Sequence, residues 1–412
     1  MKSNSFKIIL ILFSIALISL YLLWFYLFSN TTNNCNSSYK VPKLKISSDN
    51  EITDNYSDIN FSINNKKSIE SLIKLHGNST KGAIKKPYKL KLNNRINLLG
   101  INEVKQWILL ANSFDSTLLR NKIVLDFANK TRIKYTVNSE FIDLYINDDF
   151  YGNYLITEKI KSDKNMIDID IDRGDFLLEY ESNRLTEGKS YFITDVYNWR
   201  YEVKDIDLFN EEKANELKSL FSNVEKVLKS NNYNQIKKYI DIDSMVDLYI
   251  IEEYFKDPDC GFSSLYLYFK DGKLYAGPAW DFDLAMGNHP NEQYNNINNQ
   301  GDSSGDSTHS IYANQHIFGE LLKNKEFKKN VIKRYKELQP QIKGLYTGSS
   351  SMIDKYYDTY KESLELDVCR WYGEKCNTDY LKNEIQNLKK WLRKRNEWLL
   401  NEFKIATNDY EI

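Results

Sequence analysis

The sequence is poor in the residues that bind zinc and other transition metals through nitrogen or sulfur. Among its 412 residues are four histidines and four cysteines. The cysteines do not form the paired Cys-x-x-Cys units of a structural zinc site, and the histidines show no metal-ligand spacing. Both observations argue against a zinc site built from histidine and cysteine.

The sequence also lacks an excess of charge of either sign. Its formal net charge is −1 at pH 7, and basic and acidic residues are interspersed along the chain. Proteins that bind nucleic acids draw much of their affinity from a surplus of lysine and arginine. We therefore expect no nucleic-acid partner.

The N-terminus contains an uncharged apolar segment from residue 8 to residue 28. At ~1.5 Å rise per residue, a helix of this length can cross a hydrocarbon core ~30 Å thick. Lys2 and Lys7 precede the segment, so the positive-inside rule places the N-terminus in the cytoplasm and the bulk of the chain on the extracytoplasmic side. We expect a single retained transmembrane helix, with a cleaved signal peptide as the alternative.

The rest of the chain changes from strand patterns to helical patterns near residue 205. Alternating apolar and polar residues dominate before this point, and apolar residues three and four apart dominate after residue 210. This order predicts an α+β fold of two lobes with a cleft between them. The expected parts are an anchor and linker at 1–35, a strand-rich lobe at 36–205 and a helical lobe at 206–412.

One helix is expected inside the strand-rich lobe, within the segment QWILLANSFDSTLLRNKIVLDFANKT. Its apolar residues recur at helical spacing from Thr117 to Phe127. Asp115 or Ser116 is the expected N-cap, because their side-chain oxygens can accept from the first free backbone N–H groups.

Two lysines lie on one face of a predicted strand in the segment PYKLKLN. Alternation places Lys89 and Lys91 on one face and Leu90 and Leu92 on the other. Two ammonium groups ~7 Å apart on a strand suit phosphate oxygens. A solvated strand face is the other interpretation, and this segment alone does not decide between them.

Glu158 lies in the segment YGNYLITEKI, on the same strand face as Tyr154 and Ile156. A carboxylate on an otherwise apolar face needs a cationic partner. Lys89 or Lys91 could supply that partner. The alternative is that Glu158 lies at a strand end in water.

Three residues in the helical lobe show a spacing that suits phosphoryl transfer. Asp259 comes five residues before Ser264 and 22 residues before Asp281. Protein kinases place a catalytic-loop aspartate five residues before a metal-binding asparagine, and a magnesium-binding aspartate follows a short hairpin. The segment GPAWDFD, with Asp281 and Asp283, therefore predicts a metal site; a helix N-cap is the alternative.

Five segments together resemble the spore coat protein H (CotH) kinase family. In family order they are HGNSTKGAIKKPYKLKL, WILLANSFDSTLLRNKIVLDFA, IDLYINDDFYGNYLITEKI, GDFLLEYE and DCGFSSLYLYFKDGKLYAGPAWDFDLAMGN. The resemblance implies a two-lobed atypical protein-kinase-like fold that uses ATP and Mg²⁺ or Mn²⁺. The strand-rich lobe would bind the nucleotide, and the helical lobe would carry the metal-binding and catalytic motif.

The resemblance also implies which residues act in catalysis and metal binding. Asp259 would be the catalytic aspartate, and Asp281 the main metal ligand. Asp283 and Ser264 would be further metal contacts. Many family members have asparagine where Ser264 stands, and a serine hydroxyl is a weaker magnesium ligand than an amide or carboxylate oxygen.

A second group of residues is implied at the nucleotide. Lys91, or else Lys89, would contact the phosphates, with Glu158 as its ion-pair partner. The other implied residues are Asn78, Ser79, Arg120 and Glu179. The family usually has arginine where His76 stands.

The expected function is transfer of the γ-phosphoryl group of ATP to a Ser, Thr or Tyr hydroxyl of a surface or spore-coat protein. A non-catalytic, membrane-anchored surface or coat scaffold with a kinase-like fold is the main alternative, and a metal-dependent hydrolase is a third. The expected partners are an acceptor protein and, through the N-terminal helix, the membrane. Whether Cys369 and Cys376 form a disulfide stays open, because their spacing alone does not prove it.

Overall fold

The computed structural model of the chain describes most of the residues that follow the N-terminal segment. The described residues are 41–181, 189–206, 210–259, 263–290 and 316–405. The apolar segment predicted to be an anchor lies outside them. In the described part of the chain, no helix has the length and hydrophobicity that a membrane span requires.

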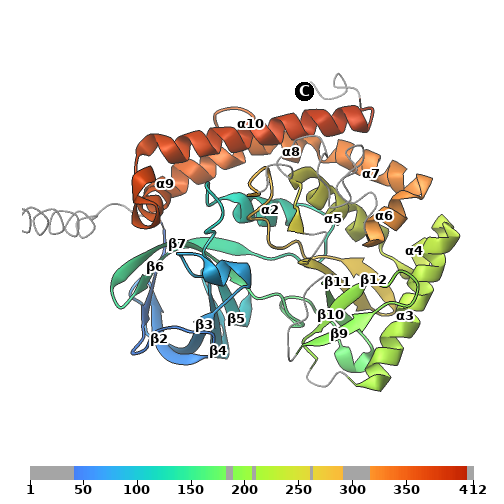
Figure 1. Cartoon of the computed structure of the whole chain (residues 1–412), viewed down its shortest axis with the longest axis horizontal. Helices are drawn as coiled ribbons and strands as arrows, with labels where there is room; N and C mark the ends of the chain where they lie inside the picture. The colour runs from blue at the N-terminus through green and yellow to red at the C-terminus, as the bar shows by residue number, and fades with distance from the viewer. Residues whose placement is uncertain (1–40, 182–188, 207–209, 260–262, 291–315, 406–412) are drawn as a thin grey trace, which may run out of the picture. The chain divides into compact units, whose positions relative to one another are not determined.

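Seven strands form a closed barrel in the N-terminal half, on the left of Figure 1. The strand order around the barrel is β1-β2-β3-β4-β5-β7-β6, and it closes through a parallel pairing of β1 with β6. The strands are β1 (Lys43–Ser47), β2 (Ser57–Ile63), β3 (Ile69–Leu75), β4 (Tyr88–Asn97), β5 (Glu103–Leu110), β6 (Ser139–Ile146) and β7 (Asp149–Glu158).

Alternation along β4 determines which side chains fill the barrel. Leu90 and Leu92 are buried in the barrel core, where Trp107 of β5 pairs with Leu90. Lys89 and Lys91 lie on the outer face, where Lys89 is partly buried and Lys91 is exposed. The predicted alternation is confirmed, because a strand directs successive side chains to opposite faces.

A second sheet of five strands has the order β12-β11-β8-β10-β9. Its strands are β8 (Phe176–Tyr180), β9 (Ser190–Ile193), β10 (Arg200–Lys204), β11 (Leu265–Lys270) and β12 (Lys273–Ala276). The hairpin β11–β12 comes from the C-terminal half of the chain and pairs with β8. The sheet thus takes strands from both sides of residue 205, and the division into lobes at 36–205 and 206–412 stays a prediction.

Most of the described helices follow residue 210, and α9 and α10 run along one side in Figure 1. The α-helices are α2 (Arg120–Ala128), α3 (Glu211–Ser230), α4 (Tyr233–Tyr239), α5 (Ile242–Phe255), α6 (His316–Leu322), α7 (Lys325–Glu337), α8 (Gln339–Tyr346), α9 (Met352–Trp371) and α10 (Thr378–Glu402). Short 3₁₀ helices are η1 (Ser79–Gly82), η2 (Ile171–Arg173) and η5 (Gly373–Lys375). The α+β fold with a strand-rich N-terminal part and a helical C-terminal part is confirmed.

Helix α2 begins later than the periodicity predicts. Its first residue is Arg120, and the N-cap position is Leu119, which provides no side-chain hydrogen bond. Asp115 still serves the helix start, because its carboxylate accepts from the backbone N–H of Arg120 at 2.7 Å and of Thr117 at 2.8 Å. The apolar period extends beyond the helix because Leu118 and Leu119 are buried in the preceding turn.

The end of α9 carries a disulfide. Cys369 and Cys376 are bonded and enclose η5, with their Cα atoms 4.3 Å apart. The structure thus answers the question that the spacing left open. Helix α9 also packs against β7, so this crosslinked end lies at the junction of the barrel and the helices.

Candidate active site

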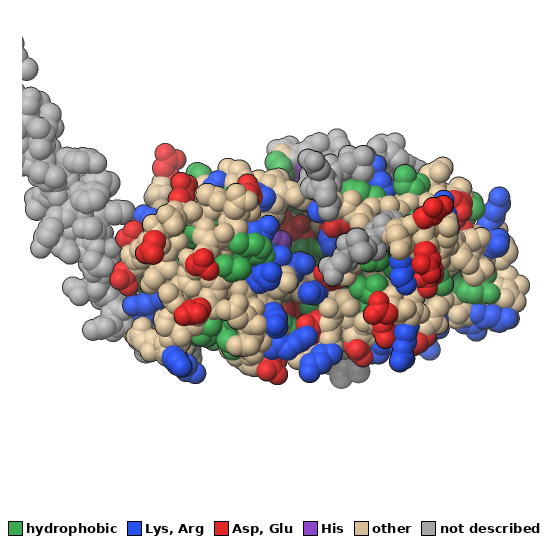
Figure 2. All heavy atoms as spheres, turned by 90° about the horizontal axis from the view of Figure 1, so that it is seen from below, with side chains coloured by type: hydrophobic (Ala, Val, Ile, Leu, Met, Phe, Trp, Pro, Cys, Tyr) green, Lys and Arg blue, Asp and Glu red, His purple; other side chains and the backbone are tan. Residues whose placement is uncertain are grey.

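A cavity of about 660 Å³ lies between the outer face of the barrel and the second sheet. Its barrel wall comes from β3, β4, β5 and the turn at 76–81, and its other wall comes from β8, β10, β11 and the segment 280–284. Figure 2 shows a hollow in this face of the molecule, with lysine and arginine side chains gathered around it. The charged residues that line the cavity are Lys74, Lys81, Lys89, Lys159, Glu179, Glu181, Lys189, Lys204, Asp259, Asp281 and Asp283.

Four carboxylates line one end of this cavity, which we call the acidic end: Glu179, Asp259, Asp281 and Asp283. Burial, together with the neighbouring carboxylates of Asp259 and Glu179, raises the pKa of Asp281 to about 6. Burial, with Asp281, Asp115 and Asp259 nearby, holds the pKa of Asp283 well above its usual range. Such crowding of like charges costs energy that a bound cation would remove.

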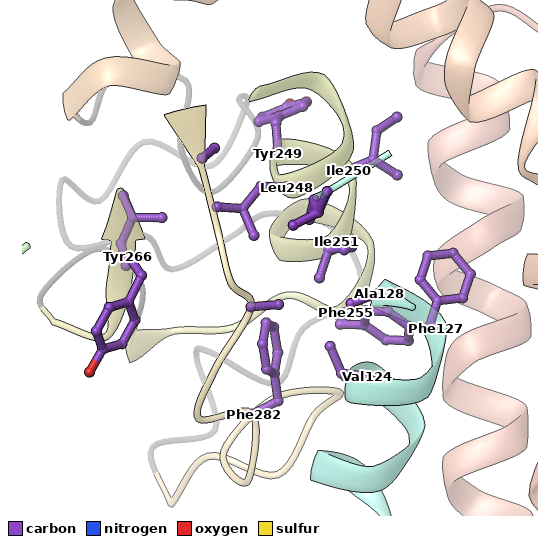
Figure 3. Packing of buried hydrophobic residues seen from close by; sticks show 14 of the residues in the cluster. Val124, Phe127, Ala128, Leu248, Tyr249, Ile250, Ile251, Phe255, Tyr266 and Phe282 are labelled. Carbon is purple, nitrogen blue, oxygen red and sulfur yellow. The ribbon is translucent and has the colours of Figure 1, made fainter. Parts of the chain in front are cut away.

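Packing of Phe282 fixes the direction of the two aspartates beside it. The ring of Phe282 is fully buried and lies 6.4 Å from the ring of Phe255 on α5. Figure 3 shows it beside Val124 of α2 and Phe255 of α5. A side chain held in the core at this position leaves the carboxylates of Asp281 and Asp283 facing the cavity. Since residues 283–287 form turns, the alternative of a helix N-cap is wrong.

Backbone strain is concentrated where Ser264 meets Asp281. Both have positive φ angles, +65° and +71°, which non-glycine residues rarely adopt. The Ser264 hydroxyl donates to Oδ2 of Asp281 at 3.3 Å. Strained residues of this kind persist where the surrounding structure holds them, and they cluster at functional sites.

The segment 112–121 holds residues 281–288, which we call the acidic loop, in place. Oδ1 of Asn121 accepts from the backbone N–H of Phe282 at 2.8 Å. The Nδ2 group of Asn288 donates to the carbonyl of Phe114 at 2.6 Å and to that of Asp283 at 2.7 Å. Sequence reasoning missed Asn121; its burial on the first turn of α2, inside a segment shared with the family, is the signal that it has a structural task.

Arg120 belongs to this supporting structure and does not line the cavity. It is 5% exposed, and its guanidinium pairs with Asp115 and donates from Nε to the carbonyl of Ala285 at 3.0 Å. The expectation that Arg120 contacts the nucleotide is corrected, because its guanidinium group is engaged by Asp115 and by the carbonyl of Ala285 and so joins α2 to the acidic loop.

Three lysines form the opposite, basic end of the cavity: Lys74, Lys89 and Lys159. Lys74 and Lys89 are direct cross-strand neighbours on β3 and β4, an arrangement of like charges that destabilises a sheet. Burial, with Lys159 and Lys74 nearby, lowers the pKa of Lys89 to about 7, and Asp205 opposes this shift. A bound anion would favour the charged form of Lys89.

The expected pairing of Glu158 with Lys89 or Lys91 is wrong. Glu158 lies opposite Trp107 inside the barrel, whereas Lys89 lies opposite Ile108 on the outer face, so the sheet separates them. Glu158 is fully buried and accepts from Asn102 at 3.1 Å and from the backbone N–H of Asn138 at 3.2 Å. The apolar face was predicted correctly, and the amide groups of Asn102 and Asn138 reach one carboxylate oxygen, Oε1. Among the described residues, the other oxygen, Oε2, is buried without a hydrogen-bond partner.

Lys91 also lies outside the cavity. It is exposed, and its ammonium group lies 5.8 Å from the ring of Tyr56. Lys89 lies at the same distance from that ring but lines the cavity. Of the two lysines considered for phosphate contact, the structure therefore brings only Lys89 to the site.

An ion pair that the sequence did not predict lies between the acidic and basic ends of the cavity. Lys204 on β10 bonds to Glu179 on β8 and to its own neighbour Glu202, at 2.8 Å each. The Tyr266 hydroxyl donates to Glu179 from the other side. Glu179 therefore faces the cavity, as the resemblance implies, and it is held by a lysine and a tyrosine from adjacent strands.

The turn that precedes β4 carries the remaining predicted residues. Asn78 and Ser79 both line the cavity beside His76. Gly77 has a φ of +84°, and a Cβ atom there would collide with the Thr80 hydroxyl, so the turn requires glycine. Burial and nearby lysines lower the pKa of His76 to about 3, so it adds no positive charge where the family usually has arginine.

The acidic end fits magnesium better than zinc. In the residues that the structure describes, no three Asp, Glu, His or Cys side chains are already arranged to hold a metal ion. Magnesium, however, is bound by one or two carboxylates together with substrate phosphates and water, without a closed protein cage. Asp281 and Asp283 offer this kind of oxygen donor. Burial and neighbouring carboxylates raise the pKa of both residues, and a bound cation would oppose that shift.

Comparison with known proteins identifies the family. No relative was found among curated proteins. The sequence model of the family described as CotH kinase protein matches residues 73–399. This match includes both walls of the cavity, from His76 to Asp283, and continues through most of α10. The chain belongs to the CotH kinase family.

Proposed function

We propose that this protein is an ATP-dependent protein kinase that phosphorylates hydroxyl groups of another protein. The observation that carries the proposal is the polarity of one cavity: buried carboxylates at one end and under-neutralised lysines at the other. A nucleotide triphosphate with a divalent cation carries complementary charges for both ends. Apolar residues between them, Ile108, Leu110, Ile160 and Leu284, offer surface for a base.

Each charged group then has a task. Asp281 and Asp283 would hold Mg²⁺ or Mn²⁺, with the Ser264 hydroxyl keeping Asp281 in place. The bound cation would supply positive charge to the phosphates of ATP. Lys89 would offset the remaining negative charge, and Glu179 with Lys204 would fix the sheet wall between the two ends.

Asp259 is the proposed acceptor of the proton. It lines the cavity and is close enough to Asp281 to raise the pKa of that residue. The oxygen of the acceptor hydroxyl forms a bond to the γ-phosphorus as the bond to the β–γ bridging oxygen breaks. ADP leaves, and the hydroxyl proton passes to Asp259. The protein contributes positioning and electrostatic stabilisation.

The acceptor and its location follow from the family name and from the sequence. We propose a surface or spore-coat protein as the acceptor, and attachment of the kinase to the membrane through residues 8–28. The alternative is a non-catalytic scaffold that keeps the fold.

The test is incubation of the full-length protein, in detergent, with radiolabelled ATP, Mg²⁺ or Mn²⁺ and extracts of candidate surface proteins. Label on a Ser, Thr or Tyr hydroxyl, identified by mass spectrometry, supports the kinase. Free phosphate without a labelled acceptor would indicate a hydrolase. Magnesium-dependent nucleotide binding with neither product would support the alternative of a non-catalytic scaffold.

A further inference from the structure

The disulfide-closed end of α9 reaches the wall of the cavity. We call residues 369–376 the disulfide loop. Two consecutive residues within it donate to backbone carbonyls: Trp371 from Nε1 to Tyr151 of β7 at 2.8 Å, and Tyr372 from its hydroxyl to Ser113, between β5 and α2, at 2.7 Å. Ser113 lines the cavity and Tyr151 does not. One bond of this pair therefore acts on the site, and the other only joins the same elements.

Ser113 and its neighbour Asn112 are hydrogen-bonded to segments on both sides of the cavity. Its hydroxyl donates to the carbonyl of Lys85 at 2.6 Å, and Lys85 ends the turn that carries Asn78 and Ser79. Its neighbour Asn112 accepts from Asn121 at 3.0 Å. Asn121 in turn accepts from the N–H of Phe282, between the two acidic residues of the loop. The side chains of Asn112 and Ser113 thus join this segment to the turn that carries Asn78 and Ser79 and, through Asn121, to the acidic loop.

A buried ion pair makes the same connection one helical turn earlier. The Lys85 ammonium lies 2.5 Å from Oδ1 of Asp367 on α9, and both side chains are fully buried. The same oxygen accepts from the N–H of Asn153 on β7 at 2.8 Å. Gly152 has a φ of +111°, and a Cβ atom there would collide with Asp367, so the strand is shaped for this approach. The helix end and the barrel therefore form one polar network.

We propose that Tyr372 is a positioning residue for the nucleotide cavity and that the Cys369–Cys376 disulfide holds it against Ser113. The crosslink closes a loop with a sequence separation of 7 and so restricts the chain that carries Tyr372. Reduction of the disulfide would free this loop and loosen Ser113, which makes nucleotide binding sensitive to the redox state. That the cavity binds a nucleotide is part of the proposed function, on which this inference rests. That Tyr372 and the disulfide hold Ser113 in place is argued from the contacts alone.

The test compares Tyr372→Phe with Trp371→Phe in the full-length protein. Each removes one hydrogen bond that the disulfide loop donates to a backbone carbonyl, and only the bond of Tyr372 is made to a cavity residue. We expect Tyr372→Phe to weaken binding of a Mg²⁺–ATP analogue about fivefold, the effect of one hydrogen bond. We expect Trp371→Phe to change this binding less than about twofold, with similar losses in Tm for both.

The disulfide is tested by the double variant Cys369→Ser with Cys376→Ser. We expect this variant, and the native protein treated with dithiothreitol, to bind the analogue as weakly as Tyr372→Phe. Dithiothreitol should not affect the double variant further. Unchanged binding in the double variant would overturn the role of the disulfide.

Hydrogen exchange of the backbone amides separates this inference from the proposed function. Tyr372→Phe should speed exchange at residues 112–115 and 77–83 more than Trp371→Phe does, without any nucleotide present. Equal exchange in the two variants overturns the inference, even if the native protein binds nucleotide. A native protein that binds no nucleotide refutes the proposed function, and the exchange difference would still support the positioning role of Tyr372.

Discussion

The two ends of the cavity differ in how their charges are held. At the acidic end, Asp281 and Asp283 are buried beside other carboxylates, with backbone strain at Asp281. At the basic end, Lys89 lies on a regular strand, and its ammonium group competes with other lysines. The acidic end is therefore built by tertiary contacts from several segments, and the basic end by strand alternation. Changes at the first should act on catalysis, and changes at the second on nucleotide affinity.

Asp281→Asn should have the largest effect. Loss of the main cation ligand is expected to lower phosphoryl transfer by at least about a thousandfold, as losses of charge stabilisation do in such reactions. The matched control is Asp271→Asn in the β11–β12 turn, where removal of a carboxylate leaves activity within about twofold. Full transfer activity in Asp281→Asn, measured with radiolabelled ATP, contradicts a metal-binding role for this residue.

A pair of variants on one strand sharpens the comparison. Lys89→Met should raise the KM for ATP by about 10- to 100-fold, because a charge-assisted bond to phosphate is lost. Lys91→Met, two residues away and outside the cavity, should change the KM by less than about twofold. Steady-state kinetics at fixed Mg²⁺ give both values. Equal effects from the two lysines would mean that the cavity is not the nucleotide site.

The binding of Mg²⁺–ATP should depend on pH through one group at the acidic end of the cavity and another at the basic end. Asp281, with its pKa raised to about 6, binds a cation only when deprotonated, so Mg²⁺-dependent binding should rise several-fold between about pH 5 and 7. Lys89, with its pKa lowered to about 7, loses its charge as pH rises through about 7, so nucleotide affinity should fall again above that pH. Asp281→Asn should remove the acidic limb, and Lys89→Met the alkaline limb. An unchanged acidic limb in Asp281→Asn assigns that limb to another group.

The raised pKa of Asp281 should also make the folded protein less stable as pH rises, whereas the same rise in pH favours Mg²⁺ binding. The folded protein holds the proton of Asp281 more tightly than the unfolded chain does. This group therefore favours folding below its unfolded pKa of about 4 and loses that contribution as pH rises through about 6. The Tm of Asp281→Asn, measured without Mg²⁺, should exceed that of the native protein at pH 7.5 and approach it near pH 4.

Glu158→Gln should have the smallest effect on function. The side chain faces the barrel core and accepts hydrogen bonds from Asn102 and Asn138. Glutamine keeps an acceptor oxygen in a similar shape, so we expect a KM for ATP within about twofold of the native value. A tenfold increase in KM would restore the idea that Glu158 acts together with a lysine of the site.

The sequence predicted the parts of the fold that depend on local periodicity. Alternation in the segment PYKLKLN placed Lys89 and Lys91 on one face and Leu90 and Leu92 on the other, and β4 has this arrangement. Which residues of different strands share a face of the sheet was harder to predict from the sequence. Glu158 on β7 and Lys89 on β4 are separated by β5, and their faces follow from the register of β5, which one sequence does not reveal.

The candidate site could be predicted where motif spacing places residues, and not where distant strands meet. Asp259 and Asp281 line one cavity because the β11–β12 hairpin returns the chain between them. The Lys204–Glu179 pair depends on the antiparallel register of β10 and β8. Arg120 was assigned to the nucleotide from its motif, but its burial against Asp115 and Ala285 could be known only from the packed structure.

The buried meeting of Lys85 and Asp367 has a consequence for biosynthesis. Nearly three hundred positions separate these partners along the chain, so a growing polypeptide makes the lysine long before the aspartate emerges. Until then the ammonium group must remain in water, because its isolated transfer to the interior is too unfavourable. The junction between the barrel and α9 can therefore close only after Asp367 has been synthesised, and a chain terminated before this residue would leave the junction open to proteases.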